Sequence, residues 1–140
     1  MFKPILLVNN SSVDSYFTLR ALRECKVVNH VLLAVSGDEA IATLESQAEG
    51  KNDGCVGLIL LNVELPKIDG FEVLKLIKSR PALKDIPVIM LSRSQLKNDR
   101  ARAQILGANG FVTKVAELDE FGDLLCKAIE PYKTALSSIA

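Results

Sequence analysis

The chain has 140 residues and a mass of 15.2 kDa; 49% of the residues are hydrophobic and 24% are charged. A chain of this length is expected to form one globular domain, which can bury roughly two thirds of its unfolded surface without disulfides or a structural metal. Seventeen basic residues balance seventeen acidic ones, so the chain lacks the basic field of a nucleic-acid-binding protein. No apolar run approaches the ~20 residues of a membrane-spanning helix, and we expect no contact with a membrane.

The three cysteines, Cys25, Cys55 and Cys126, lie far apart in the sequence. None belongs to a CxxC pair or has a histidine nearby, so neither redox chemistry nor a zinc site is indicated. An odd number of widely spaced cysteines favours reduced, mostly buried thiols in a cytoplasmic protein.

Five short apolar runs alternate with segments of helical periodicity. The first four runs are apolar at consecutive positions, which is typical of parallel strands covered by helices on both faces. Antiparallel strands with one exposed face would instead alternate apolar and polar residues. The predicted strands cover residues 5–8, 31–35, 56–61, 88–91 and 111–112.

The segments between the strands have the apolar spacing of amphipathic helices. Ser36 and Asp69 each precede a glutamate by three positions, and this capping-box pattern predicts helices that begin near Asp38 and Gly70. Pro131 is expected to end or kink the last helix, because proline removes a backbone donor. The clearest apolar stripes lie within residues 17–25, 40–48 and 121–129, whereas residues 96–106 offer little apolar bulk and predict a mobile fourth helix.

The predicted strands follow one another at intervals near the ~30 residues of a βαβ unit. Right-handed crossovers and helices on both faces then favour a doubly wound α/β fold with five parallel strands. The predicted domain covers residues 1–130, and residues 131–140 form a C-terminal tail. Such folds bind ligands in a crevice at the carboxyl ends of the first and third strands, which here carry Asn9, Asn10 and Asn62.

Two segments resemble the receiver domain of two-component response regulators. Residues 60–70 (LLNVELPKIDG) are similar to its phosphoacceptor strand and following loop, and residues 106–114 (LGANGFVTK) to its approach to the fifth strand. The resemblance covers residues 4–129 and implies a flavodoxin-like fold with strand order 2-1-3-4-5. Together with residues 86–92 (IPVIMLS), it is closest to the single-domain receivers that serve phytochrome-type histidine kinases.

In the receiver family an aspartate at the end of strand three accepts the phosphoryl group, two acidic residues after strand one hold Mg²⁺, and a lysine follows strand five. The matching positions here are Asn62, Asn9 with Asn10, and Lys114. An amide nitrogen has no lone pair for attack on phosphorus, and amides are poor substitutes for the hard anionic oxygens that bind Mg²⁺. The resemblance therefore implies a pseudo-receiver with no catalytic residue, no enzyme activity and no bound Mg²⁺. Three neutral amides and one lysine give these four positions a net charge of +1.

Three further positions of the resemblance bear on how the pocket works. Glu64 is expected either to stand over the pocket and pair with Lys114 or to be a solvated loop residue. Ser92 and Phe111 match the residues that in receivers couple the pocket to the face formed by helix four, strand five and helix five. The alternative is that Ser92 only ends a strand and Phe111 only fills the core.

Two more features lie close to the face formed by helix four, strand five and helix five. Val115 stands where the family has a proline, and because a cis bond before a non-proline residue costs ~3 kcal/mol, we predict a trans bond there. Four basic residues of the fourth-helix region form either a docking surface for an acidic partner or a solvated face. They are Arg93, Lys97, Arg100 and Arg102.

Three hypotheses for function follow from these residues. The leading one is a phosphorylation-independent module that binds a protein partner, such as a histidine kinase or a downstream signalling protein, through the face of helix four, strand five and helix five. The second is a conventional phosphoaccepting receiver, in which the asparagines were introduced by mutation or another residue accepts phosphate. The third is an anion or small-molecule sensor that uses Lys114, Ser92 and the three asparagine amides.

Overall fold

The sheet contains five parallel strands in the order β2-β1-β3-β4-β5, as predicted. A computed structural model describes residues 3–49, 56–93, 97–114 and 117–136. Within those residues no helix is long and apolar enough to cross a membrane. The strands are β1 (Ile5–Val8), β2 (Val31–Ala34), β3 (Leu58–Asn62), β4 (Val88–Ser92) and β5 (Gly110–Thr113).

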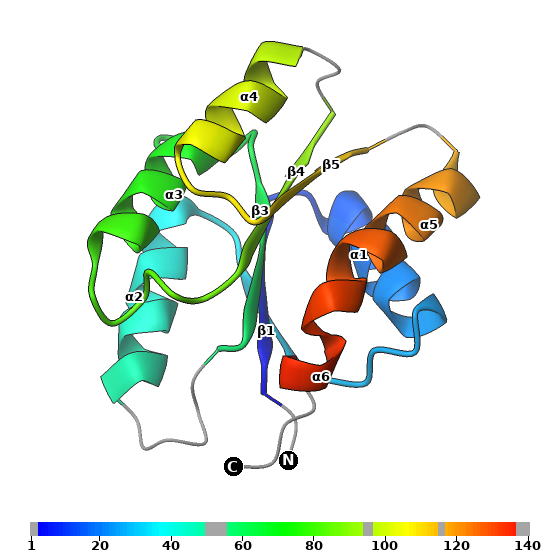
Figure 1. The fold of residues 1–140 in the computed structure, drawn as a ribbon, viewed down its shortest axis with the longest axis horizontal. Helices are drawn as coiled ribbons and strands as arrows, with labels where there is room; N and C mark the ends of the chain where they lie inside the picture. Colours follow the sequence, from blue (N-terminus) through cyan, green and yellow to red (C-terminus); the bar gives the residue numbers. More distant parts are fainter. Residues whose placement is uncertain (1–2, 50–55, 94–96, 115–116, 137–140) are drawn as a thin grey trace.

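Helices cover both faces of the sheet, with α1 and α5 on one side and α2, α3 and α4 on the other (Figure 1). Both predicted helix starts are confirmed: the Ser36 side chain accepts from the Glu39 amide at 3.2 Å, and the Asp69 side chain from the Glu72 amide at 3.0 Å. The helices are α1 (Ser12–Glu24), α2 (Gly37–Glu49), α3 (Gly70–Ser79), α4 (Lys97–Ile105) and α5 (Leu118–Ile129).

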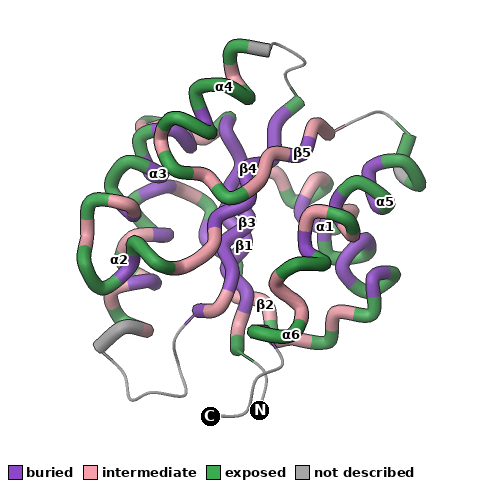
Figure 2. Tube along the Cα trace, in the orientation of Figure 1, coloured by how far each residue is buried: buried purple, intermediate pink, exposed green. Residues whose placement is uncertain are grey.

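The three central strands form the core of the molecule (Figure 2). Every residue of β1, β3 and β4 is buried, as their continuous apolar sequence predicts. Alternate side chains enter two layers, because successive residues of a strand point to opposite faces. Leu6, Ile59 and Met90 pack beneath α2 and α3, and Leu7 and Leu60 pack beneath α1 and α5. Each fully buried side chain of this kind contributes about 1.5–3 kcal/mol to folding.

Strand β2 differs from that prediction, since it lies at the edge of the sheet. Val31 and Leu32 are only half-buried, and Leu33 is exposed. The apolar run of residues 31–35 is similar to those of the central strands, and only the topology leaves β2 partly uncovered.

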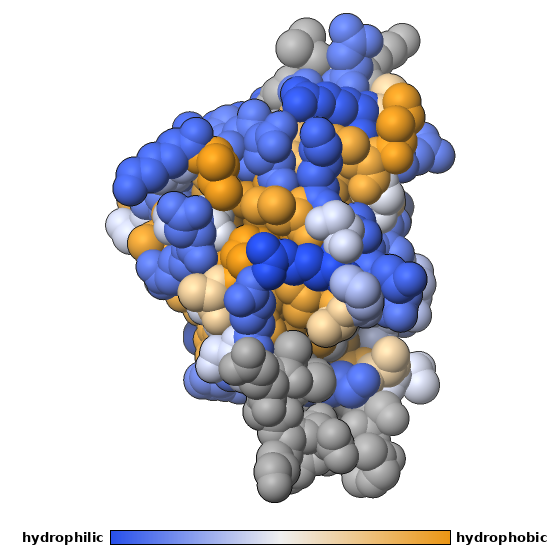
Figure 3. Space-filling model, turned by 90° about the vertical axis from the view of Figure 1, so that its left-hand side faces the viewer, coloured by the Kyte–Doolittle hydropathy of each residue, from blue (hydrophilic) through white to orange (hydrophobic). Residues whose placement is uncertain are grey.

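Charged side chains interrupt the apolar surface on the side of the molecule that carries α2 and α3 (Figure 3). Arg80, which caps the end of α3, forms an ion pair with Glu45 of α2. This contact ties the two helices together at the surface.

The described residues after α5 form two short helical elements. Pro131 ends α5 as expected, within a short turn (η2, Glu130–Tyr132), and α6 (Lys133–Leu136) follows. The Leu136 side chain is buried, and its carbonyl accepts hydrogen bonds from the Lys3 amide at 3.0 Å and the Asn29 side chain at 3.1 Å. These partners are distant in sequence, so the local pattern of the segment did not reveal them.

The prediction of reduced thiols is wrong for two of the three cysteines. Cys25, which follows α1, forms a disulfide with Cys126 of α5 across a Cα–Cα distance of 5.5 Å. The two residues are 101 positions apart, and only the packing of α1 beside α5 brings them together. Cys55 lies outside the described residues.

Gly70 marks a tight contact between the start of α3 and the end of β3. A Cβ atom there would collide with the Asn62 carbonyl oxygen and lie 2.8 Å from the Val63 Cα. We predict that Gly70→Ala lowers the free energy of unfolding by about 2–3 kcal/mol, because two backbone segments must separate to admit the methyl group. Urea denaturation measures the change.

Gly122→Ala is the matched control. A Cβ atom at this α5 position meets only the Glu24 side chain, at the ordinary distance of 3.7 Å. Alanine is the better helix former, so this variant is expected to gain about 0.5–1 kcal/mol. Equal losses in both variants would show that the Gly70 contact is not the cause.

Candidate functional site

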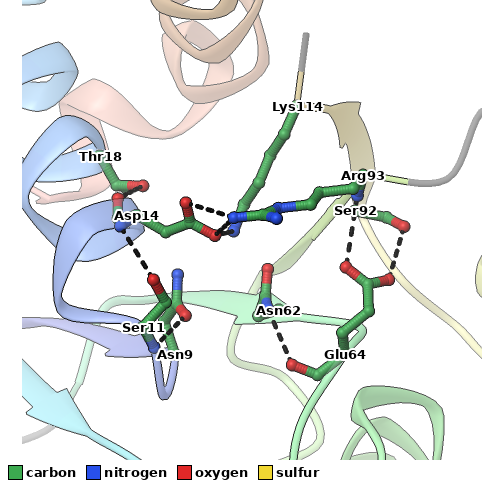
Figure 4. A network of polar contacts seen from close by, with 9 residues as sticks. All are labelled: Asn9, Ser11, Asp14, Thr18, Asn62, Glu64, Ser92, Arg93 and Lys114. Carbon is green, nitrogen blue, oxygen red and sulfur yellow. Dashed lines mark hydrogen bonds and ion pairs between the residues drawn. The ribbon is translucent and has the colours of Figure 1, made fainter. Parts of the chain in front are cut away.

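The crevice at the carboxyl ends of the strands brings together most of the predicted site residues (Figure 4). Asn9 follows β1, Asn62 ends β3, Ser92 ends β4 and Lys114 follows β5. Strands β1 and β3 are neighbours whose crossovers run to opposite sides, the place where doubly wound folds bind ligands. Asn10 lies at the same end of the sheet, but it is exposed.

Two asparagine side chains form the floor of the crevice. The Asn62 Nδ2 donates to the Glu64 carbonyl at 2.9 Å, and the Asn9 Oδ1 accepts from the Ser11 amide at 2.9 Å. Both residues are buried, with 4% and 1% exposure. Within the described part of the chain, the other amide atom of each, Asn62 Oδ1 and Asn9 Nδ2, has no hydrogen-bond partner. Both atoms point toward the side chains of Asp14 and Lys114 (Figure 4).

Asp14 is the site residue that sequence reasoning missed. It lies in the first turn of α1, where the capping residue Ser11 accepts a hydrogen bond from its amide at 3.2 Å. Its carboxylate binds the Lys114 Nζ at 3.3 Å and accepts two hydrogen bonds of 2.8 Å from the Arg93 Nη2. The sequence held one signal for Asp14. The helix that follows β1 begins at the crevice, so an acidic residue in its first turn lies close to Asn9.

Glu64 takes a position that neither sequence alternative described. Its carboxylate accepts a hydrogen bond from the Ser92 hydroxyl at 2.9 Å and another from the Arg93 amide at 3.3 Å. The residue is exposed, yet its carboxylate binds the end of β4. The expected partner, Lys114, is instead paired with Asp14.

The charges of the crevice balance. Asp14 and Glu64 supply two negative charges, and Arg93 and Lys114 supply two positive ones. The count of +1 from four positions is therefore incomplete, because it omitted the three charged residues that surround Lys114.

Asp14 and Lys114, both partly buried, shift each other's titration. Burial by itself would raise the pKa of Asp14, but the hydrogen bonds from Arg93 and the charge of Lys114 outweigh it and hold that pKa below its usual value. Burial lowers the pKa of Lys114, and the pair with Asp14 only partly offsets this. The Lys114 side chain is 10% exposed, whereas that of Arg93 is 66% exposed.

The donor set of the crevice does not fit a Mg²⁺ ion. Mg²⁺ prefers carboxylate oxygens, but both nearby carboxylates, Asp14 and Glu64, already accept hydrogen bonds from cationic or hydroxyl groups. Asn9 turns its NH₂ group toward the crevice, and Asn62 offers one neutral oxygen. Two positive side chains, Lys114 and Arg93, also lie at this end of the sheet.

The basic residues of the fourth-helix region do not form one patch. Arg93 points to Asp14, Arg100 lies over the Phe111 ring at 5.1 Å, and Arg102 lies over another ring, that of Phe71, at 4.3 Å. Phe111 is half-buried and packs against the core on the α2–α4 side. The side chain of residue 97 and the bond between residues 114 and 115 lie outside the described residues.

Comparisons with known proteins agree with this architecture. Residues 5–125 match the family described as the response regulator receiver domain. The chain is 37% identical to the response regulator Rcp1 of Synechocystis over 118 residues, which cover 84% of this chain and 80% of Rcp1. The structure of the phosphorylated cyanobacterial phytochrome response regulator RcpA is similar, with 36% identity, a TM-score of 0.84 and coverage of 99% of this chain and 100% of RcpA. The Mn²⁺-bound form of Rcp1 has 34% identity and a TM-score of 0.78, and the match covers 99% of this chain and 97% of Rcp1.

The lowered pKa of Asp14 predicts an acid-dependent loss of stability. A carboxyl group whose pKa is lower in the folded state stabilises the fold above its unfolded pKa, and this contribution disappears as the pH falls through the folded pKa. Asp14→Asn is expected to cost about 1–2 kcal/mol at pH 7, a modest value because Arg93 is largely solvated. Below about pH 4 the difference from the unmodified chain should shrink, as urea denaturation across pH will show.

Glu24→Gln is the matched control on the same helix. Glu24 forms an exposed pair with Arg20, in which both side chains are more than half exposed. Such pairs contribute little, so this variant should stay within about 0.5 kcal/mol of the unmodified chain at every pH. An Asp14→Asn deficit that persists unchanged at low pH would rule out the ion pair as its cause.

Proposed function

The chain belongs to the response regulator receiver family, and from this premise we propose that it is a receiver-like signalling protein that acts without accepting phosphate. Receiver domains interact with kinases and downstream proteins in two-component signalling. In this proposal the chain is a binding module, not an enzyme, and its output is contact with a protein partner.

One observation carries the proposal: the chain's own carboxylates already satisfy the groups that would hold a phosphoryl group. Lys114 and the Arg93 side chain bind Asp14, while the Ser92 hydroxyl and the Arg93 amide bind Glu64. A phosphoryl group has to displace these internal anions before it can use the same donors. Phosphoryl transfer depends on charge stabilisation of this kind, so the arrangement opposes it.

The chemistry of position 62 supports the same conclusion. An asparagine amide has neither the charge nor the free lone pair of an attacking carboxylate. Its Nδ2 is also committed to the Glu64 carbonyl. Because the surrounding donor set is ill suited to Mg²⁺, we expect the ion to be lost as well.

Glu64 links the pocket to the face formed by α4, β5 and α5, through which we expect the chain to bind its partner. Its bond to Ser92 holds the end of β4, and the neighbouring strand β5 carries Phe111 beneath the Arg100 guanidinium. An anion that belongs to the chain is present at all times. We therefore expect the coupling between pocket and α4–β5–α5 face to be fixed in one state, in which that face binds a histidine kinase or a downstream protein.

The alternatives are less well supported. The sensor hypothesis needs Lys114 and Ser92 to be available to an oxyanion, but each is bonded to a carboxylate of the chain. The conventional receiver needs an acceptor carboxylate at the floor of the crevice. A cytoplasmic location is part of the proposal, and because thiols are kept reduced there, experiments should include the chain with Cys25 and Cys126 reduced.

A phosphodonor tests the proposal directly. Incubation with acetyl phosphate and Mg²⁺ is expected to leave the intact mass unchanged, because position 62 lacks a nucleophile. Mass spectrometry of the intact protein measures the outcome. The set of partners captured by the chain should likewise be the same with and without the phosphodonor.

The variant Asn9→Glu, Asn10→Asp, Asn62→Asp is the positive control. It restores the three carboxylates and is expected to gain one phosphoryl group under the same conditions. A phosphoryl adduct on the unmodified chain would contradict the proposal and favour the conventional receiver.

Glu64→Gln tests the internal anion. Loss of the carboxylate should weaken the bonds to Ser92 and Arg93, so we predict amide chemical-shift changes at both residues that extend along β5 to Phe111. Glu72→Gln, on the exposed side of α3, is the matched control and should affect only its neighbours. Changes confined to the β3–α3 loop in Glu64→Gln would show that the pocket and β5 are not coupled.

A further inference from the structure

The disulfide joins two neighbouring helices at the ends that lie away from the crevice. Asp14, in the first turn of α1, pairs with Lys114, which precedes α5. Cys25 caps the opposite end of α1, and its partner Cys126 lies in the last part of α5. The two helices lie side by side (Figure 1), so an ion pair ties them at the crevice and a covalent bond ties them at the other end.

Contacts that do not involve sulfur hold the two cysteines close together. The Cys25 amide donates to the Ala21 carbonyl at 3.0 Å, and the Lys133 Nζ donates to the Cys25 carbonyl at 2.9 Å. The apolar residues of α1 and α5 that share one core layer are Ala21, Leu22, Phe121 and Leu125. Reduction would therefore leave the two thiols near each other, with their Cα atoms 5.5 Å apart, a separation that disulfides span. Closure of the bond needs no rearrangement of the fold.

The two sulfur atoms differ in how easily a soluble reagent reaches them. Cys25 is buried, with 5% exposure, whereas Cys126 is half-buried on α5. An attacking thiolate has to reach the sulfur along the line of the bond that breaks, so access controls the rate of exchange. Cys126 is the position that a small disulfide or dithiol reaches first.

We propose that Cys25 and Cys126 form a reversible thiol–disulfide pair, in which Cys126 exchanges with a low-molecular-weight disulfide such as glutathione disulfide and Cys25 completes the bond. The Cys126 thiolate attacks one sulfur of glutathione disulfide, which forms a mixed disulfide and releases one glutathione. The Cys25 thiolate then attacks the Cys126 sulfur, and the second glutathione leaves. The two protein thiols give up two electrons and two protons, and one glutathione disulfide becomes two glutathione molecules. A dithiol such as dithiothreitol reverses both steps and becomes a cyclic disulfide.

The bond restrains a helix of the proposed output face. In the oxidised chain α5 is covalently held to α1, which carries the counter-ion of Lys114. In the reduced chain only packing, hydrogen bonds and the ion pair hold the two helices together. Because α5 contributes to the face through which we expect a partner to bind, this consequence rests on the proposed function. Oxidation is then an input to that face that needs no phosphate.

Thiol labelling tests the exchange. Cys55→Ser leaves only the pair to react, and the unmodified chain is measured beside it. Glutathione disulfide is expected to protect Cys25 and Cys126 from alkylation together, and dithiothreitol should expose both again, as intact mass and peptide mapping will show. Thiols that both stay reactive, or a bond that dithiothreitol does not open in the folded chain, would overturn the inference.

Single replacements in the Cys55→Ser chain separate the two roles. Cys25→Ser removes the thiol that completes the bond, so glutathione disulfide should leave one stable glutathione adduct on Cys126. Cys126→Ser leaves only the buried thiol, whose adduct should form about 10-fold more slowly or less readily still. The same order should appear in the alkylation rates of the two thiols in the reduced Cys55→Ser chain, which contains neither replacement. Equal rates, or a faster reaction at Cys25, would overturn the assignment.

Oxidised and reduced Cys55→Ser chains test the restraint. The bond closes a loop between residues 101 positions apart, so oxidation should raise the midpoint of thermal unfolding by about 10 °C. Amide exchange in α5 should slow by about 10-fold or more. Cys25→Ser cannot form the bond and should show neither change. Exchange in α5 that is the same in both states would overturn the restraint.

These measurements use neither a partner nor a phosphodonor. Failure of the thiol pair therefore leaves the proposed function intact, and a phosphoryl adduct on the unmodified chain leaves the thiol pair intact.

Discussion

Parallel strands buried on both faces are the constraint on which this structure depends. Because β1, β3 and β4 are covered by helices on both sides, their polar backbone groups must pair within the sheet, and all their carboxyl ends emerge at one edge. Asn9, Asn62, Ser92 and Lys114 come together because of this placement. The same topology leaves β2 as an edge strand with one free row of backbone groups.

Charge compensation determines what the crevice can do. A largely buried ammonium group such as that of Lys114 needs a nearby anion, because burial without one is costly. The neutral amide at position 62 cannot supply this anion, and Asp14 of α1 pairs with Lys114. Glu64 fills the corresponding role for Ser92. The result is a network closed within the chain, and the proposal of a receiver that acts without accepting phosphate rests on it.

Helix α1 contributes to the crevice through Asp14, whereas its neighbours Val13 and Tyr16 are exposed apolar residues. The disulfide between Cys25 and Cys126 adds a further tie on this side of the sheet.

Apolar runs and capping residues determined the fold class, because it depends on local pattern and on short-range handedness rules. The resemblance of the two motif segments to receivers supplied the strand order and the matching positions Asn62, Ser92 and Lys114. The sequence alone did not identify Asp14, the partner of Glu64 or the Cys25–Cys126 pair, since each depends on which distant segments the packing brings together. The sequence also did not show that β2 is an edge strand and not a central one. Only the tertiary structure decided these points, because a side chain's partners are fixed by the three-dimensional arrangement of helices, and residues 100 positions apart in sequence leave no periodic signal of their contact.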